Sequence, residues 1–307
     1  MPSLSIVIPT LGRARSLPDV LDALGSQDPP LSNAEVLVVL DAAATRSVLG
    51  ELGSHQVVGS VIHASVAGAS AARNAGWRAA QAPLVLFLDD DIVATPRLVA
   101  EHLASHELHP APDLGILGLV EWSRRVKVSP FMRWLETGIQ FDYGTIHSTE
   151  VEWQRFYSCN VSVKREMLEL VGGFDEERFP YGYEDLDLAR RMAERGFRLR
   201  YNPDALAEHL KVETLESWRR NLRRIAVAER RFTELYPAEP AYFHDRFRVW
   251  AEAPPVKGRS ARLVRFIGPG FPWLGRVAWR SYDALCSQLL APEFLAEWEA
   301  ASEGSGR

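Results

Sequence analysis

Short apolar runs alternate with segments of helical periodicity along the first two hundred residues of the chain. The runs predict strands at residues 4–8, 35–40, 57–62, 84–88, 114–120, 160–164 and 197–201, with the last at an edge of the sheet. The intervening segments predict a helix that begins at Ser16 and others at residues 69–82, 95–106 and 184–195. Because strands that alternate with helices form mostly parallel sheets, the pattern predicts an α/β fold with a doubly wound sheet flanked by helices.

The pattern changes twice in the second half of the chain. Residues 129–158 are aromatic-rich and irregular, and we expect them to fold over a site. We therefore expect a main domain at residues 1–211, divided near residue 120, and a helical C-terminal extension at residues 212–307. The extension contains an arginine-rich helix at 214–236, a linker at 254–260 and an amphipathic helix at 272–290.

The composition is that of a globular protein, but the charge is unevenly distributed. The 307 residues are 47% hydrophobic and 24% charged, with a net charge of −5. Residues 211–280 hold 15 Lys and Arg against 7 Asp and Glu, whereas the rest of the chain holds 20 against 33. This basic region favours an anionic partner or a membrane face, although a solvated helix face explains it equally well.

Cysteine content and the N-terminal sequence indicate the compartment. Cys159 and Cys286 are too few for a disulfide framework and are compatible with a reducing environment. The N-terminus leads directly into the first predicted strand without the features of a signal peptide, and no apolar run reaches the roughly 18 residues of a membrane span. We expect a cytoplasmic protein, with peripheral membrane contact as a further option.

Three consecutive carboxylates, Asp89, Asp90 and Asp91, directly follow the apolar strand at residues 84–88. Open α/β folds bind ligands at the carboxyl ends of their strands, and carboxylate oxygens are the ligands that hard divalent cations prefer. The cluster therefore predicts a site for a metal ion and phosphate.

Further motifs before and after this cluster complete a recognisable order. A small-residue segment at 68–76 precedes it, and a glycine-rich segment at 172–176, an acidic run at 184–187 and His209 follow it. From about Ser5 to about His209, this order resembles the nucleotide-sugar-dependent glycosyltransferases of the GT-A fold, in the broad family numbered two.

The resemblance implies a Rossmann-like GT-A fold, with a nucleotide-sugar half at about 1–120 and an acceptor half at about 121–211. It implies transfer of a sugar from a UDP, GDP or dTDP sugar to a hydroxyl group, with inversion expected at the anomeric carbon. The acceptor would be a glycan, a lipid-linked molecule or a small molecule, and no nucleic acid partner is expected.

On the donor side, Asp89 and Asp91 match the Asp-x-Asp signature of the family. The resemblance makes Asp91 the first candidate for direct contact with Mn²⁺ or Mg²⁺. Asp89 would bind the ion directly or through water, or hold the ribose, and His209 would be the third metal ligand. The competing interpretations are acids that cap a helix or attract adventitious ions, and a histidine with a structural role.

The remaining nucleotide contacts are also implied by the resemblance. Asp41 would bind the base, unless it serves only as a helix N-cap. Arg73 would meet phosphate or base, unless it forms a structural ion pair, and Asn74 would bond the nucleotide or the chain. The other candidates for the nucleotide site are Pro9, Thr10, Asp90 and Lys211, of which the lysine would contact the pyrophosphate.

On the acceptor side, the resemblance assigns the general base to Asp185 and bonds with acceptor hydroxyls to Glu184. Asp187 is expected to stabilise the helix N-terminus through the helix dipole, and the whole run can also be explained as an acidic first turn. Tyr181 and Tyr183 are candidates for stacking on a sugar ring. The neighbouring aromatic residues are more typical of a core: Trp153, Phe156, Tyr157 and Phe179.

Other function classes fit the sequence less well. A non-catalytic sugar- or nucleotide-binding relative would not need both Asp185 and the Asp-x-Asp pair. A haloacid-dehalogenase-type phosphatase could use Asp89 and Asp91 as nucleophile and acid, with Val93 in the expected position. However, that family has its motif near the start of the chain, whereas about eighty residues precede it here. The basic glycine-rich N-terminal loop of a nucleotide-sugar pyrophosphorylase is missing.

Overall fold

The computed structural model describes the chain except for residues 14, 45–54, 256–271 and 305–307. The described chain divides into two units, of which the first comprises residues 1–126 and 145–211. The second comprises residues 127–144 and 212–307. Most of the linker expected at residues 254–260 therefore lies outside the described residues.

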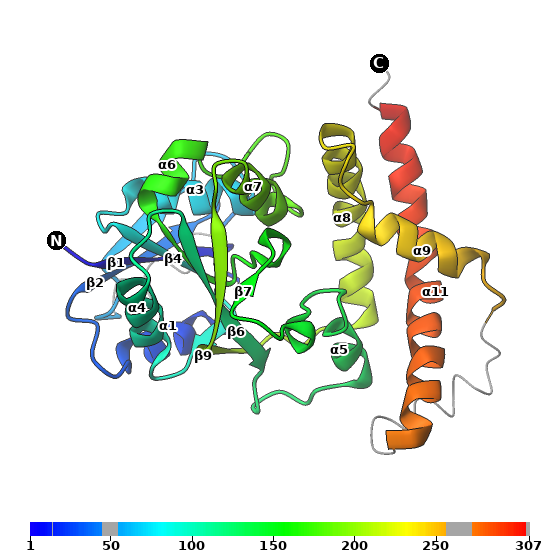
Figure 1. The fold of residues 1–307 in the computed structure, drawn as a ribbon, viewed down its shortest axis with the longest axis horizontal. Coiled ribbons are helices and arrows are strands. Elements are labelled where there is room, and N and C mark those ends of the chain that lie inside the picture. The colour runs from blue at the N-terminus through cyan, green and yellow to red at the C-terminus, as the bar shows by residue number, and fades with distance from the viewer. Residues whose placement is uncertain (14, 45–54, 256–271, 305–307) are drawn as a thin grey trace. The chain divides into compact units, whose positions relative to one another are not determined.

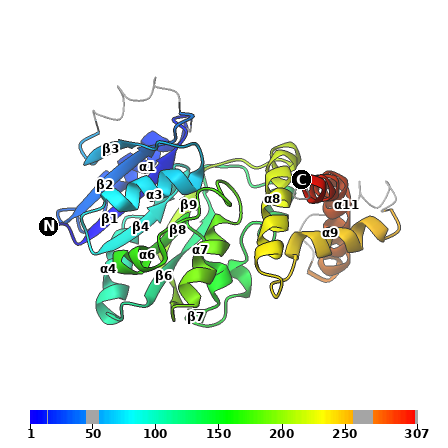
Figure 2. The same cartoon turned by 90° about the horizontal axis from the view of Figure 1, so that it is seen from above.

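A nine-stranded sheet forms the centre of the first unit. Its strand order is β3-β2-β1-β4-β8-β6-β9-β5, with β7 paired to β9. The four strands from β3 to β4 are parallel, and Figure 2 shows them in succession. The strands are β1 (Leu4–Thr10), β2 (Ala34–Leu40), β3 (Ser60–His63), β4 (Leu84–Leu88), β5 (Ile92–Ala94), β6 (Leu114–Trp122), β7 (Glu150–Val151), β8 (Asn160–Lys164) and β9 (Arg198–His209).

Helices cover both faces of this sheet. Figure 1 shows α3 (Ala69–Ala79), α6 (Arg165–Val171) and α7 (Glu184–Ala193) above the strands, with α1 (Leu17–Gly25) and α4 (Leu98–Leu108) below them. Every residue of β4 is buried, as expected for a strand covered on both faces. The alanine-rich α3 lies so close to the sheet that a Cβ on Gly76 would be 2.3 Å from Val7 Cγ1.

The prediction of an edge strand at residues 197–201 is wrong. β9 pairs in parallel with β6 on one side, and its other side pairs with β7 and then with β5. The strand also continues to His209, because an irregularity in the β6–β9 ladder allows pairing to resume beyond Asn202. The pattern of apolar and polar residues does not indicate this irregularity, so the length of β9 could not be predicted from it.

The strand directions bring several chain segments to one edge of the sheet. β1, β2, β4, β6 and β9 all end at this edge, and the antiparallel β8 begins there. Side chains that follow the strand ends therefore converge, which is where open α/β folds bind ligands.

Among its described residues, the second unit contains the helices α5 (Pro130–Leu135), α8 (Leu215–Leu235), α9 (Tyr242–Glu252) and α11 (Pro272–Gly304). Glu229 of α8 is fully buried and accepts bonds from the backbone N–H groups of Phe243 (2.7 Å) and His244 (2.9 Å), so it caps α9. Trp134 of α5 donates to Asp283 of α11 at 2.8 Å. None of the helices in the described chain is long and apolar enough to cross a membrane.

Candidate active site

Asp91 and His209 lie side by side at the carboxyl edge of the sheet. His209 Nε2 is 3.4 Å from Asp91 Oδ2, and the backbone N–H of Leu210 donates to the carbonyl of Asp91 at 2.9 Å. Trp122 stacks on the imidazole, with ring centroids 4.9 Å apart and planes at 12°. Burial would raise the pKa of Asp91, but His209 and Lys211 outweigh it and lower the pKa, so the carboxylate stays ionised.

Asp90 faces the end of β1 instead. Its carboxylate accepts a hydrogen bond from the Thr10 hydroxyl, and its carbonyl accepts one from Ser16 Oγ at 2.9 Å. Burial and the charge of Asp91 raise the pKa of Asp90 to about 7. Ser16 begins α1 as expected, but its side chain holds the acidic turn and does not cap the helix.

Arg73 joins the two acidic clusters, whose members Asp89 and Glu184 are 95 positions apart in the sequence. Its guanidinium is buried, donating to Asp89 Oδ1 at 2.9 Å and to Glu184 Oε1 at 3.2 Å. Burial alone would lower the pKa of Arg73, but the charges of Asp89, Asp185 and Glu184 raise it above its ordinary value. The arginine therefore remains charged and screens the acids from one another.

Asp185 lies in the first turn of α7. Its Oδ2 accepts a bond from the backbone N–H of Ser158 at 3.0 Å, and its Oδ1 is buried without a hydrogen-bond partner among the described residues. Burial raises the pKa of Asp185 and also that of Glu184, the latter to about 7, with Arg73 opposing both shifts. A carboxylate with a raised pKa and an unused oxygen is a suitable proton acceptor.

The turn before this helix is strained. Tyr183, the residue before Glu184, has a φ of 62°, and it is the one residue other than glycine with positive φ in the described chain. Such backbone strain clusters at functional sites because it fixes the direction of neighbouring side chains. Here it follows Gly182, which also has positive φ.

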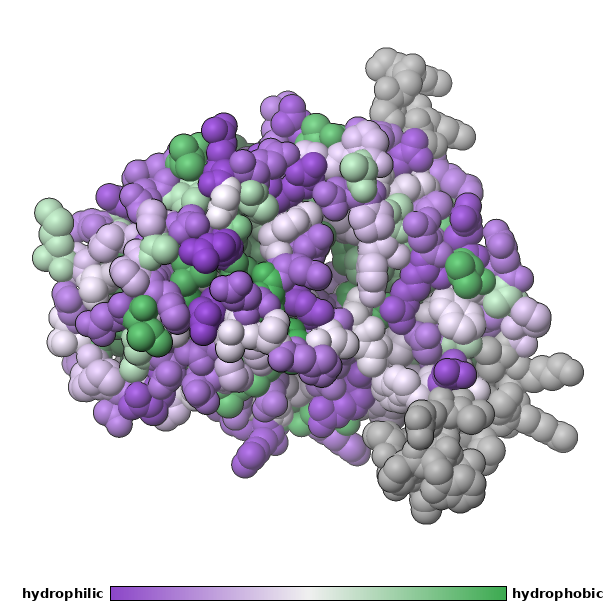
Figure 3. All heavy atoms as spheres, viewed as in Figure 1, coloured by the Kyte–Doolittle hydropathy of each residue, from purple (hydrophilic) through white to green (hydrophobic). Residues whose placement is uncertain are grey.

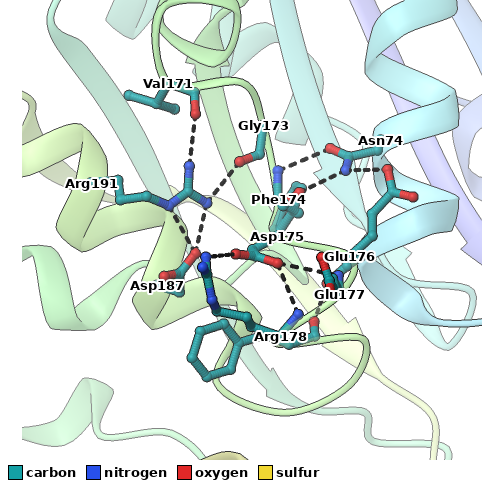
Figure 4. Close-up of polar contacts among 12 residues, drawn as sticks. Asn74, Val171, Gly173, Phe174, Asp175, Glu176, Glu177, Arg178, Asp187 and Arg191 are labelled. Carbon is teal, nitrogen blue, oxygen red and sulfur yellow. Dashed lines mark hydrogen bonds and ion pairs between the residues drawn. The ribbon is translucent and has the colours of Figure 1, made fainter. Parts of the chain in front are cut away.

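Figure 4 shows the contacts that hold the glycine-rich segment before α7. Asn74 is fully buried, and its amide donates to the Phe174 carbonyl at 2.8 Å and accepts from the Phe174 N–H at 2.9 Å. Arg191 donates to Asp187 at 2.7 Å and to the carbonyls of Val171 and Gly173 at 2.8 Å each. The amide of Asn74 is thus used by the chain, and Asp187 orients an arginine in addition to lying at the helix N-terminus.

Asp41 links the end of β2 to the start of α3. Its two carboxylate oxygens accept the backbone N–H groups of Ala43 and Gly68, at 2.7 Å each. Ser70 of α3 donates to the carbonyl of Phe179, so the loop before α7 also packs on this helix start. In that loop Tyr181 is exposed, at 39%, and Tyr183 is half-buried.

Trp122 and Ser158 are contacts that the sequence analysis missed. Trp122 meets His209 only because β6 and β9 pair in this register, and Ser158 meets Asp185 through its backbone. Neither has a local sequence signal. Over the described part of the chain, no group of three His, Cys, Asp or Glu side chains is placed to hold a metal ion by itself.

Comparison with known proteins identifies the family of the chain. Residues 2–228 match the family model described as "Glycosyltransferase like family 2". The chain is 33% identical over 225 residues to validoxylamine A glucosyltransferase of Streptomyces hygroscopicus subsp. jinggangensis (strain 5008), covering 64% of this chain and 52% of that one. It is 30% identical over 222 residues to pre-mycofactocin glycosyltransferase of Mycobacterium tuberculosis (strain CDC 1551 / Oshkosh), covering 70% and 44%. The chain thus spans about half the length of these curated relatives.

Solved structures share the fold at lower identity. The mannosyltransferase PcManGT from Pyrobaculum calidifontis, in complex with GDP-Man and Mn²⁺, matches with a TM-score of 0.63 and 18% identity, over 97% of this chain and 88% of that one. Residues 1–349 of S. aureus TarS in complex with UDP-GlcNAc match with a TM-score of 0.53 and 16% identity, over 99% and 92%.

Proposed function

The chain belongs to glycosyltransferase family 2 and has the GT-A fold, and we propose that it transfers a sugar from a nucleotide-diphosphate sugar to a hydroxyl acceptor with a divalent ion and Asp185 as base. The observation that carries this proposal is Arg73, which bonds Asp89 and Glu184 at once. Through this contact the acids expected to bind the donor and those expected to bind the acceptor form one site.

The donor set at the sheet edge fits a divalent cation. Two ligands at right angles, each about 2.1 Å from an ion, lie about 3 Å apart. The 3.4 Å between Asp91 Oδ2 and His209 Nε2 is close to this value. Two protein ligands leave room for pyrophosphate oxygens, and Asp89 can contribute through water or hold the ribose. When bound, Mn²⁺ or Mg²⁺ would neutralise the charge of the leaving nucleoside diphosphate.

Asp185 supplies the base in this proposal. Its unpartnered Oδ1 accepts the proton of the acceptor hydroxyl while the acceptor oxygen bonds the anomeric carbon. The bond from that carbon to the phosphate oxygen breaks, and its electron pair leaves with the nucleoside diphosphate. Attack opposite the leaving group inverts the anomeric configuration. Glu184 bonds an acceptor hydroxyl, and Tyr181 and Tyr183 provide stacking faces for a sugar ring.

The remaining donor contacts are assigned by their place at the same edge. Asp41, held between β2 and α3, would contact the nucleobase, with Pro9 and Thr10 at the end of β1 beside it and Asp90 bonded to Thr10. Lys211 lies close enough to lower the pKa of Asp91, and in this position it would neutralise pyrophosphate. Asn74 acts on the nucleotide indirectly, by holding the segment around Phe174.

A thermal-shift panel tests the function directly. UDP, GDP, dTDP and their sugars are each added with Mn²⁺ or with chelator, since a ligand that binds only the native state raises the melting temperature. We expect the nucleotides of one nucleobase to raise the melting temperature most, and only in the presence of Mn²⁺. The absence of any nucleotide-dependent shift would contradict the proposal.

A further inference from the structure

A gap in the β6–β9 ladder separates the regular part of β9 from the residues that reach the site. Gly118 pairs with Asn202 and Val120 pairs with Ala207, so residues 203–206 of β9 lie opposite Leu119 alone. The carbonyls of Leu119 and Ala205 are left outside the ladder, and buried carbonyls require hydrogen-bond donors.

Asn160, the first residue of β8, supplies both bonds. Its Nδ2 donates to the Ala205 carbonyl at 2.9 Å and to the Leu119 carbonyl at 3.2 Å, and its side chain is fully buried. The approach is close, because a Cβ on Gly118 would lie 2.2 Å from Asn160 Nδ2. Asn160 therefore fills the gap in the ladder in place of a strand partner.

His102 of α4 fixes the orientation of this amide. Its Nε2 is 2.9 Å from Asn160 Oδ1, which can only accept, so Nε2 carries the proton. Its Nδ1 is 2.8 Å from Ser162 Oγ, which is also 2.9 Å from His106 Nε2. Burial lowers the pKa of His102 to about 4, so the ring is neutral and Nδ1 accepts from Ser162. Ser162 therefore donates to His102, and His102 donates to Asn160, which leaves the amide nitrogen of Asn160 directed at the gap.

The segment beyond the gap carries His209. Pairing resumes at Val120 with Ala207 and continues to Trp122 with His209, whose ring then stacks on Trp122 beside Asp91. Because side chains alternate between the faces of a sheet, a slip of one residue after the gap would turn His209 to the other face. The number of residues accommodated in the gap therefore decides whether His209 reaches Asp91.

We propose that Asn160, oriented by His102, is a positioning residue that sets the register of β9 and so places His209 opposite Asp91. The inference rests on the proposed metal role of His209. Residues that orient metal ligands typically change metal affinity by about 10- to 100-fold when they are replaced.

A double-mutant cycle tests this role. Asn160→Asp keeps the shape of the side chain but replaces its donor with an acceptor. Calorimetry of GDP and UDP in the presence of Mn²⁺ should show affinity about tenfold weaker than wild type, with binding in chelator unchanged. In a His209→Ala background the same change should have no further effect. An equal loss in both backgrounds, or no loss in a folded Asn160→Asp protein, would overturn the inference.

A matched control and a second readout separate positioning from general destabilisation. Asn202→Asp is the control, because it removes the amide donor of a β9 residue that lies before the gap. In wild type, Asn202 Nδ2 donates to Ser105 Oγ at 2.9 Å. Amide hydrogen exchange at residues 204–209 should rise in Asn160→Asp and not in Asn202→Asp. If Asn160→Asp does not fold, His102→Leu, which cannot donate to Asn160 Oδ1, should show the same exchange pattern.

The two proposals can fail separately. If His209→Ala leaves Mn²⁺-dependent nucleotide binding unchanged, the metal role of His209 is wrong. In that case hydrogen exchange alone decides the positioning role, and equal exchange in the Asn160 and Asn202 variants would refute it.

Discussion

At the level of single residues, Asp91 and His209 are adjacent in the structure, and Arg73 reaches both acidic clusters. The sequence is compatible with two roles for Arg73, contact with the ligand or a structural ion pair. The structure shows ion pairs with Asp89 and Glu184. Trp122 and Ser158 could not be predicted, because their contacts depend on strand register and on a backbone N–H group.

Asp185→Asn should reduce kcat by about 10² to 10⁴ fold with donor affinity nearly unchanged, because the amide cannot accept the acceptor proton. Glu177→Gln, an exposed acid in the preceding loop, is the matched control and should leave kcat within about twofold. A near-wild-type rate for Asp185→Asn would remove this residue from the role of base.

The pH dependence of the rate gives an independent check on the base. Burial raises the pKa of Asp185 and of Glu184, so the pair takes up protons at a higher pH than isolated carboxyls do. A protonated base is inactive, and kcat should therefore fall as the pH is lowered through the apparent pKa of the pair. Transfer assays between pH 5 and pH 9, a range of about four units around the raised pKa, measure kcat as a function of pH. A kcat that does not change with pH over this range would show that neither acid serves as the base.

At the level of elements, the sequence predicts the order of strands and helices, and errors occur where long-range pairing decides. β9 extends twelve residues and is paired on both sides, which the alternating segment at residues 197–201 could not indicate. The gap in the β6–β9 ladder makes this possible, and Asn160 of β8 donates to the two carbonyls that the gap leaves unpaired. The helices α6, which has seven residues, and α9 were also missed.

His102 and His106 should make the first unit sensitive to acid. Burial lowers their pKa values to about 4 and about 3, from 6.5. Between pH 6.5 and pH 4 the unfolded chain therefore binds protons that the folded chain does not. The free energy of unfolding should fall with decreasing pH in this window, by about 1.4 kcal/mol per pH unit for each histidine.

His106→Gln tests this, because glutamine can still donate to Ser162 but does not titrate. Urea unfolding between pH 7 and pH 5 should show a smaller pH slope in this variant than in wild type, whereas His147→Gln, at an exposed position, should leave the slope unchanged. The slopes of the variants must be compared with that of wild type, because Asp90 and Glu184 also titrate. Their pKa values are raised, so they change the free energy of unfolding with pH in the opposite direction. Equal slopes for His106→Gln and wild type would refute the assignment.

At the level of the whole molecule, the sequence could not predict that residues 127–144 belong with the C-terminal helices. The association depends on contacts such as Trp134 with Asp283, which lie 149 residues apart. The surface is also informative, since Figure 3 shows hydrophilic residues over most of the visible face, with hydrophobic residues scattered in small groups. On this face, attraction to a membrane would therefore have to be electrostatic.

The arginines of α8 are the candidates for such an attraction. Arg220, Arg223, Arg224 and Arg231 are exposed, although Arg220 pairs with Glu216 at 3.3 Å and Arg223 with Glu293 at 3.7 Å. We expect the chain to co-sediment with vesicles that contain anionic lipid, to a degree that falls with salt, and not with neutral vesicles. A lack of binding to anionic vesicles at low ionic strength would show that these charges serve only contacts within the protein.

In the proposed function, the carboxyl edge of the sheet binds a nucleoside diphosphate through a divalent ion at Asp91 and His209. Calorimetric titration of GDP and UDP into wild type and Asp91→Asn, each with Mn²⁺ and with chelator, tests it most directly. We expect one nucleotide to bind wild type about tenfold or more tightly with Mn²⁺ than with chelator, and Asp91→Asn to lose that difference while remaining folded. Equal affinity of wild type with Mn²⁺ and with chelator would refute metal-dependent nucleotide binding at this edge.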